Sequence, residues 1–206
     1  RLLLDDAVTT SSERFPALQL ALHYAADGES DWTYGGDLAV NQGLGHDKAA
    51  SDSEFGYLLF TPSFNLGRDV SERTSASFTV SGQYSDDRLP TTKQWVLGGI
   101  DMLAAYLPGV AVGDRGWVAV ADLQYRVPTP RRLRLDPRLF VEHGGAQLRH
   151  GATVVLADVG AELAFRWQPH LKASLAGALP LADNNIDAST RRDARATLLF
   201  SIRMQF

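Results

Sequence analysis

The sequence predicts an all-β protein, an antiparallel transmembrane β-barrel with about ten strands in this chain. Three observations support this class: apolar and polar residues alternate, the alternating segments are long, and the connections between them differ in length. The clearest segment is 194–206, where one parity is apolar and five of the six residues on the other parity are polar or charged. A period of two residues indicates a strand with two different faces. The final strand of a soluble sandwich would show the same alternation.

The same alternation predicts the other strands, of which 93–97 is shorter than the rest and 171–179 weaker. In chain order they are expected near residues 16–24, 32–41, 54–66, 75–84, 93–97, 119–127, 133–142, 158–168 and 171–179. Most of these segments have nine or more residues. Strands in soluble domains usually have about five or six residues, whereas a tilted strand needs about 9–11 to cross a bilayer. Strand length therefore favours the membrane.

The connections fall into two groups. Short connections are expected near residues 67–72, 128–132 and 168–170. Long ones are expected near residues 43–53, 85–92, 99–115, 144–153 and 182–193. Transmembrane barrels have short turns at one end and long loops at the other, so this division supports the same fold.

Aromatic residues lie near the ends of the parity that would face outward. They are expected to form the girdles that lie at headgroup depth, or to cap the core of a soluble domain. These residues are Trp32, Tyr34, Phe55, Tyr57, Tyr84, Trp117, Tyr125, Trp167 and Phe206.

Charges of both signs lie on the inward parity. A packed core would not accept them, because unpaired buried charges are very costly, whereas a hydrated lumen would. We expect these side chains to line the lumen and to pair partly across strands. They are Asp122, Arg126, Arg134, Arg138, Glu142, Glu162, Arg166, Arg195 and Arg203.

Composition excludes several other classes of protein. With 206 residues the chain is expected to be one domain, and its net charge of −4 offers no basic surface for nucleic acid. It has no cysteine, and its five histidines lack the spacing of a zinc site. No G-x-S-x-G motif is present, and no apolar run is long enough for a membrane-spanning helix. We therefore expect no enzyme activity, no metal and no cofactor.

The segment 94–127 resembles the C-terminal barrel of two-partner-secretion transporters (TpsB, the haemolysin secretion/activation proteins), which belong to the superfamily of BamA-type barrels. The family pattern is F-x-L-G-G, a long loop with V-R-G-Y, then G-D-x-G, followed later by F-x-D-x-G. The matching residues here are Leu97, Gly98 and Gly99, then Leu103, Ala104, Ala105 and Tyr106, then Gly113, Asp114 and Gly116, and finally Phe140, Glu142 and Gly144. The resemblance spans roughly residues 36–206.

This chain departs from the family pattern at the loop. In the family, the loop arginine pairs inside the lumen with the acidic residue of the wall motif. Here that arginine position is Ala104, and the acidic position is Glu142. We expect the loop to occupy the lumen through Leu103, Tyr106 and Leu107, without the ion pair.

The resemblance implies an outer-membrane protein of a Gram-negative bacterium. It would be a pore that exports and activates a haemolysin-like or adhesin-like exoprotein. Its partners would be outer-membrane lipid, the exoprotein and the barrel-assembly machinery, with Phe206 as the assembly signal. The family barrel is larger and follows POTRA domains, so we expect residues 1–206 to be the C-terminal part of a barrel domain. The alternatives are a divergent small barrel or anchor, and a soluble β-barrel that binds a ligand.

Overall fold

The computed structural model describes residues 17–28, 31–44, 56–99, 102–130, 132–148, 151–167, 171–186 and 196–204. This part of the chain is almost entirely β-structure, with one short 3-10 helix at Thr91–Lys93. The strands are β1 (Ala17–Asp27), β2 (Trp32–Gly43), β3 (Leu58–Ser71), β4 (Thr74–Gln83), β5 (Trp95–Leu97), β6 (Ala111–Gly113), β7 (Arg115–Tyr125), β8 (Leu133–Gln147), β9 (Val154–Trp167), β10 (Leu171–Asn184) and β11 (Thr197–Met204).

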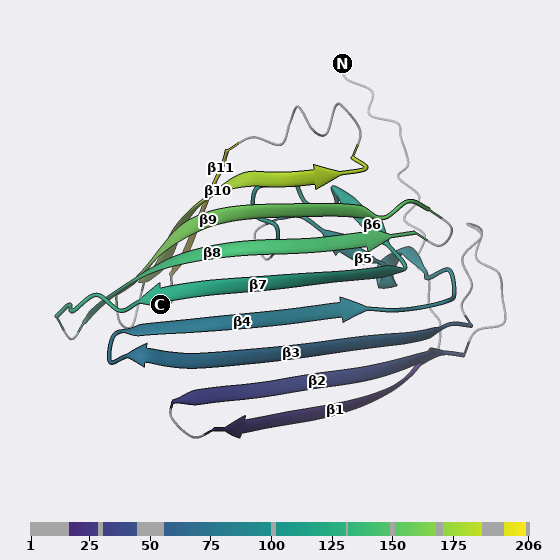
Figure 1. Ribbon diagram of the computed structural model, residues 1–206, viewed down its shortest axis with the longest axis horizontal. Coiled ribbons are helices and arrows are strands. Elements are labelled where there is room, and N and C mark those ends of the chain that lie inside the picture. The colour runs from purple at the N-terminus through teal and green to yellow at the C-terminus, as the bar shows by residue number, and fades with distance from the viewer. Residues whose placement is uncertain are drawn as a thin grey trace, which may run out of the picture.

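Nine of these strands form one curved antiparallel sheet in the order β1-β2-β3-β4-β7-β8-β9-β10-β11 (Figure 1). Each strand pairs with the next one along the chain, except that β5 and β6 intervene between β4 and β7. Consecutive pairing of long antiparallel strands is the up-and-down arrangement of transmembrane barrels. The predicted all-β antiparallel fold is therefore confirmed.

The short strand predicted at residues 93–97 is present, but it does not belong to the main sheet. Only Trp95–Leu97 is a strand, and it pairs with β6 in a separate two-stranded hairpin. This hairpin contacts β7 and β8. Gly98 and Gly99 have φ angles of +95° and +107°, a region that favours glycine, and they turn the chain after β5.

The outer face of the sheet is apolar from β1 to β11. Cross-strand neighbours on this face include the pairs Leu22–Leu38, Phe64–Val80, Leu123–Leu139, Leu163–Leu175 and Leu175–Phe200. Many of these side chains are exposed, among them Leu20 at 64% and Phe200 at 75%. An apolar surface that extends over nine strands is far larger than single exposed leucines and is typical of a face in contact with lipid. No helix in the described part of the chain could span a membrane.

The other face carries the polar parity. Asp37 of β2 accepts a hydrogen bond from the Ser63 hydroxyl at 2.9 Å and lies 2.5 Å from His23 Nδ1. The Ser77 hydroxyl donates to Asp122 at 2.5 Å across β4 and β7. These pairs show polar side chains satisfied across strands on the inward face, as expected for a hydrated lumen.

Tyr57 is not part of an outward aromatic girdle, so that prediction is wrong. Its side chain is 1% exposed and clusters with Leu59 and Leu89. Along β3 the exposed apolar residues are Leu58 and Phe64, so Tyr57 and Leu59 lie on the inward parity. A shift of one residue moves every side chain of a strand to the opposite face, and the strand predicted at 54–66 differs from β3 by such a shift.

The connections differ at the two ends of the sheet. At one end β3 and β4 are joined through Glu72 and Arg73, so the predicted short connection at 67–72 begins later, because β3 continues to Ser71. The Ser71 hydroxyl accepts hydrogen bonds from the backbone N–H groups of Arg73 and Thr74 at this turn. At the opposite end, residues 84–94 form one long loop and residues 98–110 another, and the described part of the second loop (98–99 and 102–110) folds against the inward face. We call the two ends the turn end and the loop end.

Candidate functional site

The loop 98–110 is compact because its backbone hydrogen-bonds to itself. Gly99 N–H donates to Tyr106 O at 3.0 Å, and Tyr106 N–H donates to Leu103 O at 3.0 Å. The loop also requires glycine at its base. A Cβ at Gly98 would lie 2.1 Å from Leu107 O, which is closer than any real side chain approaches. The G-G pair of the sequence motif therefore shapes the loop.

Two carboxylates on the sheet hold the loop by its backbone. Ala104 N–H donates to Glu142 Oε2 at 3.0 Å, and Ala105 N–H donates to Asp158 Oδ2 at 2.7 Å. Glu142 of β8 and Asp158 of β9 are direct cross-strand neighbours, and their side chains are 5% and 0% exposed. A carboxyl oxygen can accept a hydrogen bond from a backbone N–H group whether or not the acid is ionised. The pair of acids therefore matches the pair of consecutive N–H groups.

Tyr106 and Thr197 extend this attachment to β10 and β11. The Tyr106 hydroxyl lies 3.1 Å from Ala157 O and 2.9 Å from Ala182 O, so it can share its proton between two carbonyl oxygens. The Thr197 hydroxyl donates to Ala105 O at 3.2 Å. Burial, and then the negative charges of Asp183 and Asp158, raise the pKa of Tyr106 to about 12. Its hydroxyl therefore stays protonated near neutral pH and donates.

Apolar contacts complete the docking of the loop. Leu103 is fully buried, and a Cβ on Gly144 of β8 would lie 3.3 Å from its Cδ1 and 2.8 Å from Trp117 O. Phe140, which is 4% exposed, lies over Gly160 of β9, where a Cβ would come within 2.2 Å of the ring. The wall motif thus provides one acceptor, Glu142, between two close-packed positions, Phe140 and Gly144.

The second loop motif forms the base of the hairpin. Asp114 is 1% exposed and accepts a hydrogen bond from Leu89 N–H at 2.9 Å and from Gln94 Nε2 at 3.4 Å. It therefore attaches the loop 84–94 to the junction between β6 and β7. Gly113 and Gly116 permit close packing, because a Cβ would lie 2.5 Å from Gln147 N at Gly113 and 2.0 Å from the Trp95 ring at Gly116.

The predicted lumen charges separate into two groups. Asp122, Arg138 and Glu162 come together beside the loop: Arg138 Nε lies 3.4 Å from Asp122 Oδ1, and Arg138 Nη1 lies 3.5 Å from Glu162 Oε2. These three side chains line a cavity of about 490 Å³ together with Ala104 and Glu142. The second group lies at the turn end of the sheet and comprises Arg126, Arg134, Arg166 and Arg203. Phe206 and Arg195 lie outside the described residues.

The structure differs from the expectations at Leu107, which does not contribute to docking because it is 68% exposed. It also shows two further contacts. Glu142 contacts the loop through Ala104 N–H instead of an arginine side chain. Asp158 is not among the predicted site residues, although it lies on the inward parity of its strand and accepts from Ala105 N–H. That parity was the available signal, but only the β8–β9 register places Asp158 beside Glu142.

Replacing Ala104 with Arg is expected to strengthen the attachment of the loop. The residue lines the same cavity as Glu142, Asp122 and Glu162, so a guanidinium there can form a charge-assisted contact. Limited proteolysis of the protein in detergent should cut the loop 98–110 several-fold more slowly in Ala104→Arg than in wild type. Ala104→Met, which has a long side chain without charge, is the control. Equal cleavage rates in Ala104→Arg and wild type would contradict the prediction.

Comparisons with known proteins identify the same type of barrel. The chain is similar to CdiB from Escherichia coli, with a TM-score of 0.75 and 16% identity over 92% of this chain and 36% of that one. It is also similar to CdiB from Acinetobacter baumannii, with a TM-score of 0.67 and 14% identity over 91% of this chain and 33% of that one. At these identities the similarity shows the fold.

Sequence similarity extends to a named relative and to a family. The heme/hemopexin transporter protein HuxB of Haemophilus influenzae (strain 86-028NP) is 26% identical over 117 residues, which are 52% of this chain and 20% of HuxB. The chain therefore spans about a fifth of the length of that relative. A family model described as haemolysin secretion/activation protein ShlB/FhaC/HecB matches residues 1–165. That match covers most of the chain, which thus belongs to the family of haemolysin secretion/activation proteins.

Proposed function

We propose that this chain is part of an outer-membrane pore of two-partner secretion in a Gram-negative bacterium. The single observation that carries the proposal is the loop 98–110, held by Glu142 and Asp158 against the polar face of a sheet whose opposite face is apolar. An apolar exterior fits lipid, and a polar interior with a removable plug fits a passage for an unfolded chain. The exported protein would be a haemolysin-like or adhesin-like exoprotein, activated by its passage.

The hydrogen bonds that hold the loop suggest how an exported chain could displace it. Glu142 and Asp158 accept hydrogen bonds from backbone N–H groups, and every unfolded polypeptide carries such groups. The N–H groups of an exported chain could therefore take the place of those of Ala104 and Ala105 without leaving a buried carboxylate unpaired. Exchange of equivalent hydrogen bonds costs little, because few groups lose their partners at any stage. In this proposal transport requires no nucleotide, metal or cofactor and no enzyme activity.

The proposal includes three partners. Outer-membrane lipid would contact the apolar face, and the exoprotein would contact the lumen. The barrel-assembly machinery would recognise Phe206 as the assembly signal. The name of HuxB refers to heme/hemopexin transport, and for this chain we propose only the general class of exoprotein.

A plugged membrane anchor is the second candidate function. It is favoured by the number of strands that hold the loop, because Ala104, Ala105 and Tyr106 have hydrogen-bond partners on β8, β9, β10 and β11. An anchor would keep this plug permanently, whereas a secretion pore must release it.

Deletion of residues 100–113 is expected to separate the two candidates. The complete gene product, reconstituted in a planar lipid bilayer, should conduct ions more strongly after the deletion if a lumen lies beneath the loop. In the native host, loss of the gene should remove one specific protein from the culture medium, and complementation should restore it. An unchanged set of medium proteins, together with a folded outer-membrane protein, would contradict secretion and favour the anchor.

A further inference from the structure

Four basic residues lie side by side on the inward face at the turn end. In the sheet register, Arg134 of β8 lies opposite Arg166 of β9. Arg166 in turn lies opposite Lys172 of β10, and Lys172 lies opposite Arg203 of β11. Like charges directly opposite each other destabilise a sheet. A continuous row of four basic side chains is therefore expected to bind an anion. We refer to these four residues as the cation row.

The cation row has little neutralisation within the protein. Arg134 Nε lies 2.5 Å from Asp136 Oδ2. Among the described residues, Arg166, Lys172 and Arg203 have no carboxylate within ion-pair distance. Asp136 is 5% exposed, and its second oxygen, Oδ1, has no hydrogen-bond partner in the described part of the chain.

The unpaired cations share a cavity of about 320 Å³ with polar groups. Its lining includes Asp136, Ser174 and Ser201 beside Arg166, Lys172 and Arg203. The two serine hydroxyls hydrogen-bond to each other at 2.9 Å and can reorient toward a ligand. Arg203 follows Ile202 of the lipid-facing parity, so the row points to the lumen and away from lipid. This placement favours a ligand inside the pore over a lipid headgroup.

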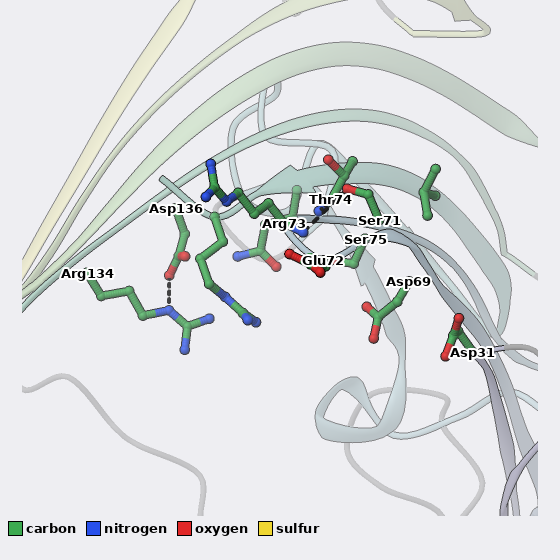
Figure 2. Close-up of a pocket in the computed structure, with 12 residues that line it drawn as sticks. Asp31, Asp69, Ser71, Glu72, Arg73, Thr74, Ser75, Arg134 and Asp136 are labelled. Carbon is green, nitrogen blue, oxygen red and sulfur yellow. Dashed lines mark hydrogen bonds and ion pairs between the residues drawn. The ribbon is translucent and has the colours of Figure 1, made fainter. Parts of the chain in front are cut away.

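The remainder of the turn end carries charges of both signs. A neighbouring pocket of about 300 Å³ is lined by Asp31, Asp69 and Glu72 together with Arg73 and Arg126. Figure 2 shows Asp31 and Asp69 on one side of this pocket and Arg134 with Asp136 on the other, with Glu72 and Arg73 between them. Apart from Asp136 of β8, the acids that line these pockets lie toward β1–β4, and the cation row lies toward β8–β11. An anionic ligand would be directed to the β8–β11 side.

We propose that the cation row binds acidic side chains of the exported polypeptide, in extended conformation, at the turn-side mouth of the lumen. This inference rests on the proposed secretion function. Four neighbouring strands about 4.8 Å apart place the ends of the row roughly 14 Å apart. Side chains on one face of an extended chain repeat about every 6.6–6.8 Å. Three acidic residues at alternate positions therefore match the length of the row. Short turns face the periplasm in outer-membrane barrels, which is the side from which an exported chain enters.

Peptide binding tests the proposal directly. The complete gene product in detergent micelles would be titrated into a fluorescein-labelled peptide with glutamate at alternate positions, with fluorescence anisotropy as the readout. The same peptide with glutamine or lysine in those positions is the ligand control. At low salt we expect the glutamate peptide to bind at least tenfold tighter than the glutamine peptide, and the difference should shrink as salt screens the charges.

Matched protein variants locate the binding to the row. Arg166→Gln/Lys172→Gln/Arg203→Gln should raise the Kd of the glutamate peptide about tenfold. Lys172→Gln alone should weaken binding more than Lys93→Gln, which removes the same charge in the 3-10 helix between β4 and β5. Faster migration of the unboiled protein on a gel, compared with the boiled protein, confirms that each variant has folded.

Several outcomes would overturn the proposal. These are equal binding of the glutamate and glutamine peptides by wild type, or an unchanged Kd in the folded triple variant. The proposal is also overturned if the variants bind phosphatidylglycerol in nanodiscs more weakly than wild type does while peptide charge has no effect on binding. The cation row would then bind lipid headgroups. If these results occur while the exoprotein still reaches the medium in a gene-dependent way, only the cation-row inference fails. If no medium protein depends on the gene, the proposed function fails.

Discussion

Removal of both carboxylates that hold the loop, in the variant Glu142→Ala/Asp158→Ala, is expected to release residues 98–110 from the lumen. A hydrogen bond contributes about 1.5–3 kcal/mol when its acceptor is charged and about 0.5–1.5 kcal/mol when it is neutral, so the two together contribute roughly 2–6 kcal/mol to docking of the loop. That loss shifts the docking equilibrium by roughly 10–10⁴-fold. Single-channel conductance in planar bilayers should rise, and protease should cut the loop faster.

The matched control keeps the acceptors and removes the charges. In Glu142→Gln/Asp158→Asn each side chain retains a carbonyl oxygen that can accept from Ala104 N–H or Ala105 N–H. We expect this variant to fall between wild type and the alanine variant in conductance and in loop cleavage, with a docking loss of about 1–3 kcal/mol. If the alanine and amide variants behave alike, charge and not hydrogen bonding holds the loop. If the alanine variant behaves like wild type, the two carboxylates do not hold it.

Gly160→Ala is expected to destabilise the wall of the sheet beside the loop. Its Cβ would lie 2.2 Å from Phe140 Cζ and 2.6 Å from Gly177 O, so the ring and a neighbouring strand would both have to move. Overpacking of this kind costs about 1–3 kcal/mol. Displacement of Phe140 would also disturb Glu142, two residues further along β8. The temperature at which the unboiled gel band converts to the unfolded mobility should fall.

Gly177→Ala is the control for that experiment. Gly177 lies on the neighbouring strand β10, and the nearest atom to a Cβ there, Thr197 O, is 3.9 Å away. The added methyl group therefore makes an ordinary contact and should leave the conversion temperature unchanged or slightly higher, because alanine restricts the unfolded chain more than glycine does. Equal effects of the two alanine substitutions would show that the close contact of Phe140 with Gly160 is not important for stability.

Part of the site could be read from the motifs, and part could not. The resemblance to the family motifs points to Gly98, Gly99, Tyr106, Asp114 and Glu142, and the structure places all of them at the loop or its base. Asp158 and Thr197 are not part of those motifs, although each contributes a hydrogen bond to Ala105. They come from strands that lie more than 50 residues further along the chain, as the sequence separations of 53 and 92 show. Nothing local in the sequence reports such pairings.

The sequence by itself determined the strands and their two faces, because alternation is a local property that each strand carries in its own residues. The predicted face is wrong at Tyr57, because alternation alone does not show which parity of a strand faces inward. A shift of one residue exchanges the two faces. Only the tertiary structure decided which acid meets which loop residue and that Arg134, Arg166, Lys172 and Arg203 form one row. The physical reason is that register is set between strands. The groups that Glu142 and Asp158 recognise are backbone N–H groups, which nearly every residue carries and no sequence pattern marks.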